Sequence, residues 1–317
     1  MIKDQRLLLL TLCWALLAGC GKTRISVQWT AIETGTTQDL NSVCLAGNQL
    51  FIAGGIRYDS ALLASSADGG VHWNKYPDTI HKALYCIRFQ DADTGFATGY
   101  DGKILKTTDA GLHWSLYQSM YFPIRSIFYA GHRQIITVGG NGWSRGEIHR
   151  SADEGNSWDN DTLANELRDV FFTSPANGFA CGYGAIFQTT DGGASWNYTK
   201  AKGDLFTSIC FTNSLTGVCC GFSGTLLKTT DGGNTWKTIR NGSNLLNASR
   251  SFNQLVFRSP LEGYLVGDEG VFWKTLDGGD HWDEIKNTPS GNWKAIALIP
   301  GGGYIVGSGG KMYRFAE

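Results

Sequence analysis

The chain has 317 residues, of which 42 are Gly, 11 are Trp and only 6 are Pro. Charged residues make up 17% and the formal net charge at pH 7 is −1. This excludes a disordered chain, which needs low hydrophobicity with high net charge, and gives no sign of wholesale nucleic-acid binding. So much Gly also argues against a helical protein, because Gly is costly inside helices.

The N-terminal segment predicts export. Lys3 and Arg6 precede an apolar run over residues 7–18, which is shorter than the about 20 residues needed to span a bilayer. A positive flank, a short apolar stretch and small residues are typical of a secretory signal peptide. The run ends in Leu17-Ala18-Gly19-Cys20, which resembles the lipobox of bacterial lipoproteins. The resemblance implies cleavage before Cys20 and lipid attachment to its thiol. A plain signal peptide followed by an unrelated cysteine is the alternative.

This signal predicts three parts of the chain: a signal peptide (1–19), a short lipid-anchored tether (20–24) and one folded domain (25–317). Acyl chains bind a membrane through buried CH₂ groups at about 0.8 kcal/mol each. We therefore expect a membrane-anchored protein whose folded part stays in solution on the exported side. Gly21 follows the cysteine, where lipoproteins retained on the inner membrane carry Asp, so the resemblance favours the outer membrane.

Beyond the signal, one eight-residue pattern recurs: Ser or Thr, any residue, Asp, any residue, Gly, two residues, Trp. Asp with Gly two residues later predicts a tight turn between strands, because the carboxylate accepts backbone N–H bonds and Gly tolerates φ > 0. The Trp then enters the next strand and buries its ring, so the pattern indicates structure rather than catalysis. The copies span 66–73, 107–114, 151–158, 189–196, 229–236 and 275–282.

The repeat length predicts the fold. Successive Trp residues of the pattern, counted from Trp29, lie 38 to 46 residues apart. In one unit, strand-like runs cover 169–173, 178–182 and 185–189, and a fourth follows the turn. A four-stranded unit of about 40–45 residues is a blade of a β-propeller. We predict an all-β, seven-bladed propeller of four-stranded antiparallel sheets.

The two ends of the chain predict how the ring closes. The last unit has strand-like runs at 295–298, 304–306 and 311–314 and lacks an outer strand, while the segment 27–32 has the pattern of one. We expect the N-terminal strand to complete the C-terminal blade, which removes exposed sheet edges.

Six cysteines follow Cys20, and the positions that four of them share with other blades favour small buried apolar residues. Cys181 and Cys220 take a position that other blades give to Val, and Cys44 and Cys210 share one position on two innermost strands. Export permits oxidation, and a Cys210–Cys219 disulfide across a hairpin is an alternative that the residues leave open. No metal-ligand spacing is present, and we predict no metal, no cofactor and no catalytic residue.

One face of a propeller carries the loops before each innermost strand and the loops between second and third strands, while the box turns lie toward the other face. We expect a partner on the first face, since loops on a rigid scaffold usually carry function. Tyr, Trp and Arg are typical of binding hot spots. The predicted binding residues are Arg57, Tyr58, Tyr85, Tyr100, Arg125, Trp143, Arg145, Arg168 and Lys294. A solvated rim without a partner is the plain alternative.

The repeat resembles the Asp-box (BNR repeat) of sialidase-type propellers. Thr-Thr-Asp-Gly-Gly-x-x-Trp, together with Gly-Phe-Ala-x-Gly at 95–99 and 178–182, is similar to the photosystem II stability/assembly factor-like propellers over nearly the whole mature chain. That resemblance implies a non-enzymatic protein that binds newly made reaction-centre polypeptides through a basic patch. The residues placed to form such a patch are Arg125, Arg168 and Lys294.

We therefore expect a monomeric, membrane-tethered scaffolding propeller that recognises a protein partner and binds no nucleic acid. One alternative is a sialidase-like glycoside hydrolase, which needs three arginines, a Tyr–Glu pair and an acid Asp. Its Arg-Ile-Pro motif is missing, and residues 123–125 run in the reverse order. Another is a carbohydrate-binding propeller whose aromatic residues stack on sugars in the central channel. His72, His113 and His281 each precede a box Trp, which indicates turn residues rather than ligands.

Overall fold

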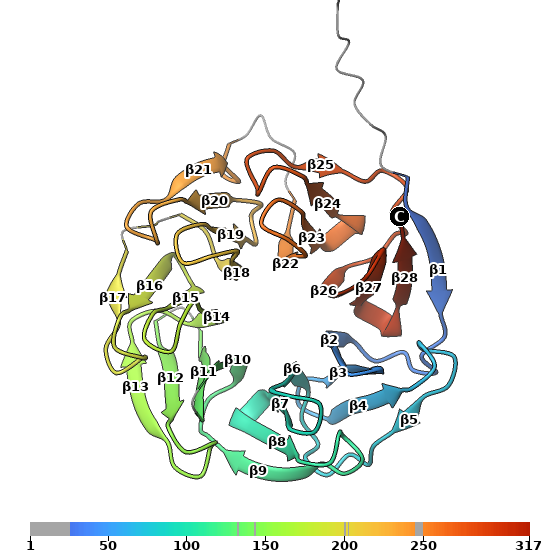
Figure 1. Cartoon of the computed structure of the whole chain (residues 1–317). Helices are drawn as coiled ribbons and strands as arrows, with labels where there is room; N and C mark the ends of the chain where they lie inside the picture. Colours follow the sequence, from blue (N-terminus) through green and yellow to red (C-terminus); the bar gives the residue numbers. More distant parts are fainter. Residues whose placement is uncertain (1–25, 132, 143, 200, 202, 245–249) are drawn as a thin grey trace, which may run out of the picture.

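The computed structural model describes residues 26–131, 133–142, 144–199, 201, 203–244 and 250–317. The predicted signal peptide, the tether and Cys20 lie outside the described residues. Within these ranges the strands form seven four-stranded antiparallel sheets arranged in a ring around a central channel (Figure 1). The predicted seven-bladed propeller is confirmed. Over the same ranges, no helix has the length and apolar character needed to cross a bilayer.

Each of the first six blades runs outward in chain order from the channel to the rim. The strands are β2 (Leu40–Ala46), β3 (Gln49–Ile56), β4 (Ser60–Ser66) and β5 (Asn74–Lys75); β6 (Leu84–Phe89), β7 (Gly95–Gly99), β8 (Lys103–Thr107) and β9 (Ser115–Ser119); β10 (Ile124–Gly131), β11 (Gln134–Gly140), β12 (Gly146–Ser151) and β13 (Asp159–Leu163); β14 (Leu167–Phe172), β15 (Gly178–Gly182), β16 (Ala185–Thr189) and β17 (Asn197–Tyr198); β18 (Phe206–Phe211), β19 (Gly217–Gly221), β20 (Leu226–Thr229) and β21 (Lys237–Arg240); β22 (Phe252–Phe257), β23 (Gly263–Gly267), β24 (Phe272–Thr275) and β25 (Asp283–Glu284).

The seventh blade is built from both ends of the chain. Its inner strands are β26 (Trp293–Ile299), β27 (Gly302–Gly307) and β28 (Met312–Ala316), and its outer strand is β1 (Gln28–Ile32). Trp29 pairs with Phe315 across the β1–β28 ladder. Figure 1 shows β1 beside β28, where the blue and red ends of the chain meet. The predicted closure by the N-terminal strand is therefore confirmed.

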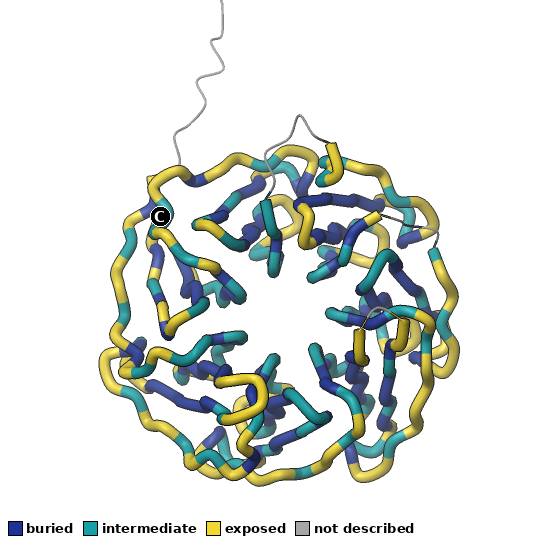
Figure 2. The backbone as a smooth tube through the Cα atoms, turned by 180° about the vertical axis from the view of Figure 1, so that it is seen from behind, coloured by how far each residue is buried: buried dark blue, intermediate teal, exposed yellow. Residues whose placement is uncertain are grey.

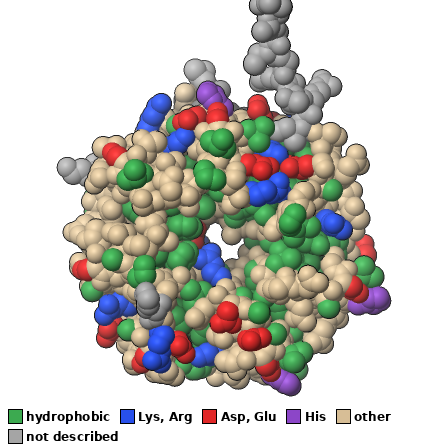
Figure 3. Space-filling model, viewed as in Figure 1, with side chains coloured by type: hydrophobic (Ala, Val, Ile, Leu, Met, Phe, Trp, Pro, Cys, Tyr) green, Lys and Arg blue, Asp and Glu red, His purple; other side chains and the backbone are tan. Residues whose placement is uncertain are grey.

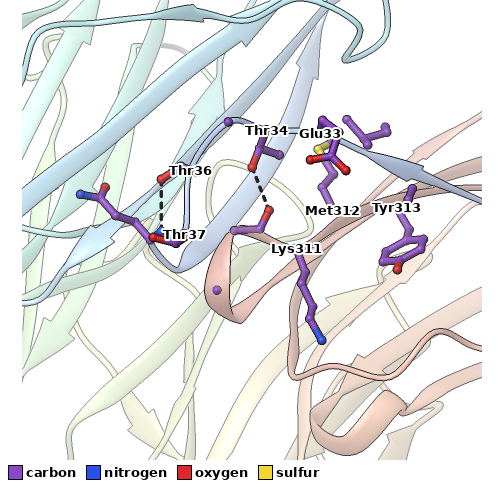
Figure 4. A pocket seen from close by; sticks show the side chains of 13 residues that line it. Glu33, Thr34, Thr36, Thr37, Lys311, Met312 and Tyr313 are labelled. Atoms are coloured by element: carbon purple, nitrogen blue, oxygen red, sulfur yellow. Dashed lines mark hydrogen bonds between the residues drawn. The ribbon is translucent and has the colours of Figure 1, made fainter.

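A hollow of about 660 Å³ lies where β1 leaves the seventh blade. It is lined by Thr34, Thr36, Lys311 and neighbouring residues (Figure 4). The Thr34 hydroxyl donates a hydrogen bond to the Gly310 carbonyl over 2.8 Å. This bond joins the segment between β1 and β2 to the turn between β27 and β28. The Thr34 hydroxyl in the wall of this hollow is therefore already hydrogen-bonded, and the opposite charges of Glu33 and Lys311 sum to zero. We assign the hollow to ring closure rather than to ligand binding.

The Asp-box turns have the predicted geometry. In the fourth blade, the Thr189 hydroxyl donates to Asp191 over 2.8 Å and accepts the Gly193 N–H over 2.8 Å. The Ser195 N–H and hydroxyl donate to Asp191 over 2.9 and 2.6 Å. These bonds, from Ser195 first and then Thr189, lower the pKa of Asp191 to about 2. The Trp196 indole donates to the Gly193 carbonyl over 3.2 Å, which fixes the ring against the turn.

The box histidines are turn residues, as predicted. Nδ1 of His72, His113 and His281 lies 2.6 to 2.7 Å from the box aspartate four residues earlier. The imidazole thus replaces the Ser or Thr hydroxyl that other copies place there.

Apolar side chains pack between neighbouring sheets, and the box glycines permit this contact. Gly233 has φ of 83°, and a Cβ there would overlap the ring of Phe179 in the preceding blade. Phe179 stacks on Phe211 with ring centroids 4.2 Å apart, and Trp236 packs edge-on against both rings. Figure 2 shows the result: buried strands inside each blade, half-buried strands along the channel and an exposed outer ring.

The alternative of a Cys210–Cys219 disulfide is wrong. Cys210 pairs with Val218 and Cys219 pairs with Ile209, so the two thiols point to opposite faces of their sheet. They belong to different hydrophobic clusters, and both are free. Cys219 instead faces Cys181 of the preceding blade. Burial raises the pKa of both thiols, as predicted for small apolar residues.

Candidate functional site

The second residue of each innermost strand lines one mouth of the central channel. Because the seven blades repeat, these positions form a ring, which we call the mouth ring. Its members are Asn41, Tyr85, Arg125, Arg168, Thr207, Asn253 and Lys294. Four of the nine predicted binding residues therefore lie together: Tyr85, Arg125, Arg168 and Lys294.

Three members of the mouth ring hold neighbouring blades together. Asn41 donates to the Leu84 carbonyl over 2.8 Å. Thr207 donates to the Phe252 carbonyl over 2.8 Å, and Asn253 donates to the Trp293 carbonyl over 2.9 Å. Each bond joins one blade to the first residue of the next inner strand. These short polar side chains are structural.

Lys294 is neutralised at the ring closure. Its ammonium group lies 2.6 Å from Asp39 and 3.0 Å from the Asn41 amide oxygen. Burial opposes the charge on Asp39, but the hydrogen bonds from Lys294 and from the Gly309 N–H outweigh it and lower the pKa of Asp39. Lys294 therefore belongs to this ion pair rather than to a group with the two arginines of the mouth ring.

Below the mouth ring, Asp169 holds three blades together. Its carboxylate accepts hydrogen bonds from the hydroxyls of Ser126 and Ser208 over 2.8 and 3.1 Å. It also accepts the N–H groups of Val170 and Ile209 over 2.9 and 3.0 Å. Four bonds occupy both carboxylate oxygens, so Asp169 has little capacity left for a ligand or a proton-transfer role.

Two arginines of the mouth ring and one loop arginine converge on a hollow of about 280 Å³. We call it the basic hollow and define it by Arg57, Arg125, Arg168 and Glu166. Figure 3 shows basic side chains reaching the central opening on the side of β10 and β14. Three guanidinium groups and a single carboxylate line this hollow, so its lining carries an excess of positive charge.

The one carboxylate of the basic hollow is buried and shared. Glu166 Oε1 lies 3.4 Å from Arg125 Nε and 3.2 Å from Arg168 Nη2, and the Glu166 side chain is 4% exposed. Burial and the neighbouring Arg125 charge lower the pKa of Arg168. Nε of Arg168 is buried without a hydrogen-bond partner within the described residues, and Nε of Arg125 has only the 3.4 Å contact to Glu166. One carboxylate does not balance the arginines of this hollow, which favours a ligand that accepts hydrogen bonds at the exposed edges of the guanidinium groups.

Aromatic rings orient the arginines. The Arg125 guanidinium carbon lies 4.3 Å from the centroid of the Tyr85 ring. The Arg57 guanidinium carbon lies beside the pair of Tyr58 and Tyr100, 5.1 Å from each ring centroid, and the two rings are 4.9 Å apart. Such cation–π contacts hold a guanidinium group in place and leave its N–H edges free to donate.

The remaining predicted binding residues differ in position. Arg145 pairs with Glu147 over 2.8 Å and lies over the Phe122 ring at 4.8 Å, outside the basic hollow. Trp143 lies outside the described residues.

Glu166 and Asp39 were not predicted. Both are acidic residues that directly precede an innermost strand. An acidic residue at this repeated position is the sequence signal that could have indicated them.

This arrangement fits anion binding better than catalysis. Glu166 is held between two arginines and Asp169 is saturated by hydrogen bonds. Within the part of the chain that the structure describes, no three His, Cys, Asp or Glu residues gather to hold a metal ion.

Comparison with known proteins gives one family match. A family model described as photosynthesis system II assembly factor YCF48 matches residues 162–247. A curated relative, the photosystem II assembly lipoprotein Ycf48 of Synechococcus sp. (strain CC9902), is 32% identical over 158 residues. The aligned part is 45% of this chain and 44% of that relative. The chain thus matches less than half of the relative's length.

Among solved structures, YCF48 bound to D1 peptide is similar with a TM-score of 0.72 and 22% identity, covering 91% of this chain and 97% of that one. Virginiamycin B lyase from Staphylococcus aureus reaches the same TM-score at 14% identity, covering 92% and 99%. At these identities the likeness shows the fold alone, and the fold admits both a binding protein and an enzyme. With the family match, the predicted resemblance to photosystem II assembly factor-like propellers is confirmed.

Proposed function

We propose that this chain, a propeller resembling the photosystem II assembly factors, is a non-enzymatic scaffold that binds an acidic segment of a polypeptide partner in the basic hollow. The observation that carries the proposal is a hollow lined by three arginines and one carboxylate: Arg125 and Arg168 contact the buried Glu166, and Arg57 lines the same hollow. Arginine forks pair with carboxylates through two parallel hydrogen bonds. The closed ring holds them in place, so little ordering entropy is lost on binding.

The similar proteins support a polypeptide partner. One solved relative is described as bound to D1 peptide, and the curated relative is described as an assembly lipoprotein. We extend from them the class of ligand, a peptide, and the mode of attachment, a lipid on Cys20. Export to a membrane surface places the propeller near membrane polypeptides, and the choice of the outer membrane stays a prediction.

Charge reversal tests the proposal. The full chain carrying Arg125→Glu and Arg168→Glu, purified from detergent-solubilised membranes of its own organism, is expected to lose the partner that the wild type retains. Because these arginines are partly buried, a second variant, Arg57→Glu, changes an exposed side chain. It should weaken the same partner and keep the wild-type melting temperature.

A matched control reverses two exposed charges away from the hollow, Lys237→Glu and Arg314→Glu. This control has the same net charge as the double arginine variant, so it separates a local site from a general charge effect. It should keep the partner, and raising NaCl should weaken wild-type binding. A partner set unchanged in both the double arginine variant and Arg57→Glu would rule out binding at the basic hollow.

A further inference from the structure

A second hollow lies beside the basic hollow, toward the outer rim of the same face. It measures about 430 Å³, and we call it the rim hollow. Its walls include Tyr100, Met120, Tyr121, Phe122, Pro123 and Asn141, together with Asp101 and Lys103, which carry opposite charges. Tyr121 is 84% exposed, the highest exposure among the large apolar side chains of the described residues. Exposed aromatic rings grouped in a hollow are typical of a binding surface rather than of a folding core.

The backbone of this rim segment is fixed at both ends. The segment follows β9 and precedes β10. The Met120 N–H donates to the Gly102 carbonyl over 2.9 Å, and the Pro123 carbonyl accepts the Gly140 N–H over 3.1 Å. Between these anchors the rings of Tyr121 and Phe122 contact edge to face, with centroids 4.7 Å apart. The rings are thus presented to solvent by an ordered backbone, and binding them costs little ordering entropy.

The two hollows are continuous. Pro123 and Asn141 line both of them. Arg57 lines the basic hollow and stacks on Tyr100, which lines the rim hollow. The surface from the channel mouth to the rim is therefore one groove, positively charged at its inner end and aromatic at its outer end.

We propose that this groove recognises a polypeptide segment at two points: a carboxylate in the basic hollow and a large apolar side chain in the rim hollow. The inference rests on the proposed function and names what the partner must carry. Pro123 and Asn141 form a wall shared by the two hollows, so one short extended segment can reach both. Because an extended chain advances about 3.3 Å per residue, the apolar residue of the partner should stand within a few residues of the acidic one.

A membrane surface is the other occupant to test, because the chain carries a lipidation signal. The charge of the groove favours the peptide. The aromatic rings line a hollow that continues to arginine side chains only 17 to 29% exposed. A peptide side chain can enter this recess, whereas a flat lipid surface would contact the rim alone.

The test uses the whole mature chain carrying Cys20→Ser, so that no lipid contributes. The probes are four fluorescein-labelled Gly/Ser decapeptides that carry Phe or Ala two residues from Asp or Asn. In fluorescence anisotropy at low salt, the Phe/Asp peptide should bind most tightly. Replacing its Phe by Ala should weaken binding about tenfold, the size expected for one buried aromatic side chain. Replacing Asp by Asn should also weaken it.

The protein variant Tyr121→Ser with Phe122→Ser should remove the preference for Phe and keep the preference for Asp. Leu112→Ser, which changes an exposed apolar residue on an Asp-box turn, should keep both preferences.

If the double variant still prefers Phe, the rim subsite is wrong and the proposed function stands. If no peptide distinguishes Asp from Asn, anion recognition fails and both proposals fall. If the double variant loses binding to phosphatidylcholine/phosphatidylglycerol vesicles and keeps the preference for Phe, the rim is a membrane contact and the peptide subsite is overturned.

Discussion

At the scale of single residues, equivalent positions carry different tasks. The mouth ring places Asn41, Thr207 and Asn253 in the same position as Arg125 and Arg168. The short polar side chains reach the next blade's carbonyl and are used there. The longer side chains of Arg125 and Arg168 instead contact the Glu166 carboxylate and line the basic hollow. In a repeat protein, candidate binding residues are therefore those repeat positions whose side chains do not make the hydrogen bond that joins neighbouring blades.

The box hydroxyl gives a test at this scale. Thr189→Val keeps the shape of a fully buried residue and removes the acceptor of the Gly193 N–H. Because a buried donor loses its partner, we expect the free energy of unfolding to fall by about 2 kcal/mol in urea titration. Thr190→Val, at the exposed neighbouring position, should change it by less than about 0.5 kcal/mol. Equal losses in the two variants would mean that the hydroxyl does not organise the turn.

At the scale of elements, the first strand completes a sheet that the end of the chain begins. β1 pairs along its whole length with β28. Trp29 adds packing against the sixth blade, because its ring lies 5.1 Å from Phe272. One short strand therefore covers the free edge of β28 and contacts two blades, which joins the ends of the ring.

Trp29→Ala tests this closure. Removing the half-buried ring takes away contacts with Phe272, Tyr313 and Phe315. We expect a loss of about 3 kcal/mol in the free energy of unfolding. Thr30→Ala, on the exposed side of the same strand, is the matched control and should have a small effect. A loss below about 1 kcal/mol for Trp29→Ala would show that β1 contributes little to ring stability.

At the scale of the whole molecule, we propose a rigid ring on a lipid tether. The ring supplies a fixed groove, and the tether would hold that groove near a membrane.

Cys20→Ser should move the protein from the membrane fraction to the soluble fraction, because the proposed acylation site is lost. Cys13→Ser, inside the predicted signal peptide, is the control and should leave the protein in the membrane fraction. The measurement is fractionation of whole cells with an alkaline carbonate wash. Membrane retention of Cys20→Ser through that wash would contradict the lipid anchor.

The local sequence was enough to predict the architecture. Asp-box spacing counts the blades, and the pattern around Trp29 identifies the missing strand, because turns and strand periodicity are set by neighbouring residues. Repetition also indicated that Tyr85, Arg125, Arg168 and Lys294 share one loop face, since equivalent positions in a closed ring lie around one channel. Cys181 and Cys220 are buried, as their equivalence with Val predicts, while Cys44 and Cys210 on innermost strands are only half-buried because those strands border the channel. The Cys210–Cys219 alternative failed because strand register decides which face of the sheet each thiol takes.

The tertiary structure alone decided which charges remain available. Lys294 and Arg125 are equivalent in the repeat, and each contacts a carboxylate that precedes the next innermost strand, Asp39 and Glu166. The excess positive charge of the basic hollow comes from Arg168, which shares that one carboxylate with Arg125, and from Arg57, which lines the same hollow. Glu166 lies between two arginines, and Pro123 joins the aromatic rim to them. Those contacts join residues of different blades and loops. Coulombic and packing interactions depend on distance in space, which a repeat pattern in one dimension does not contain.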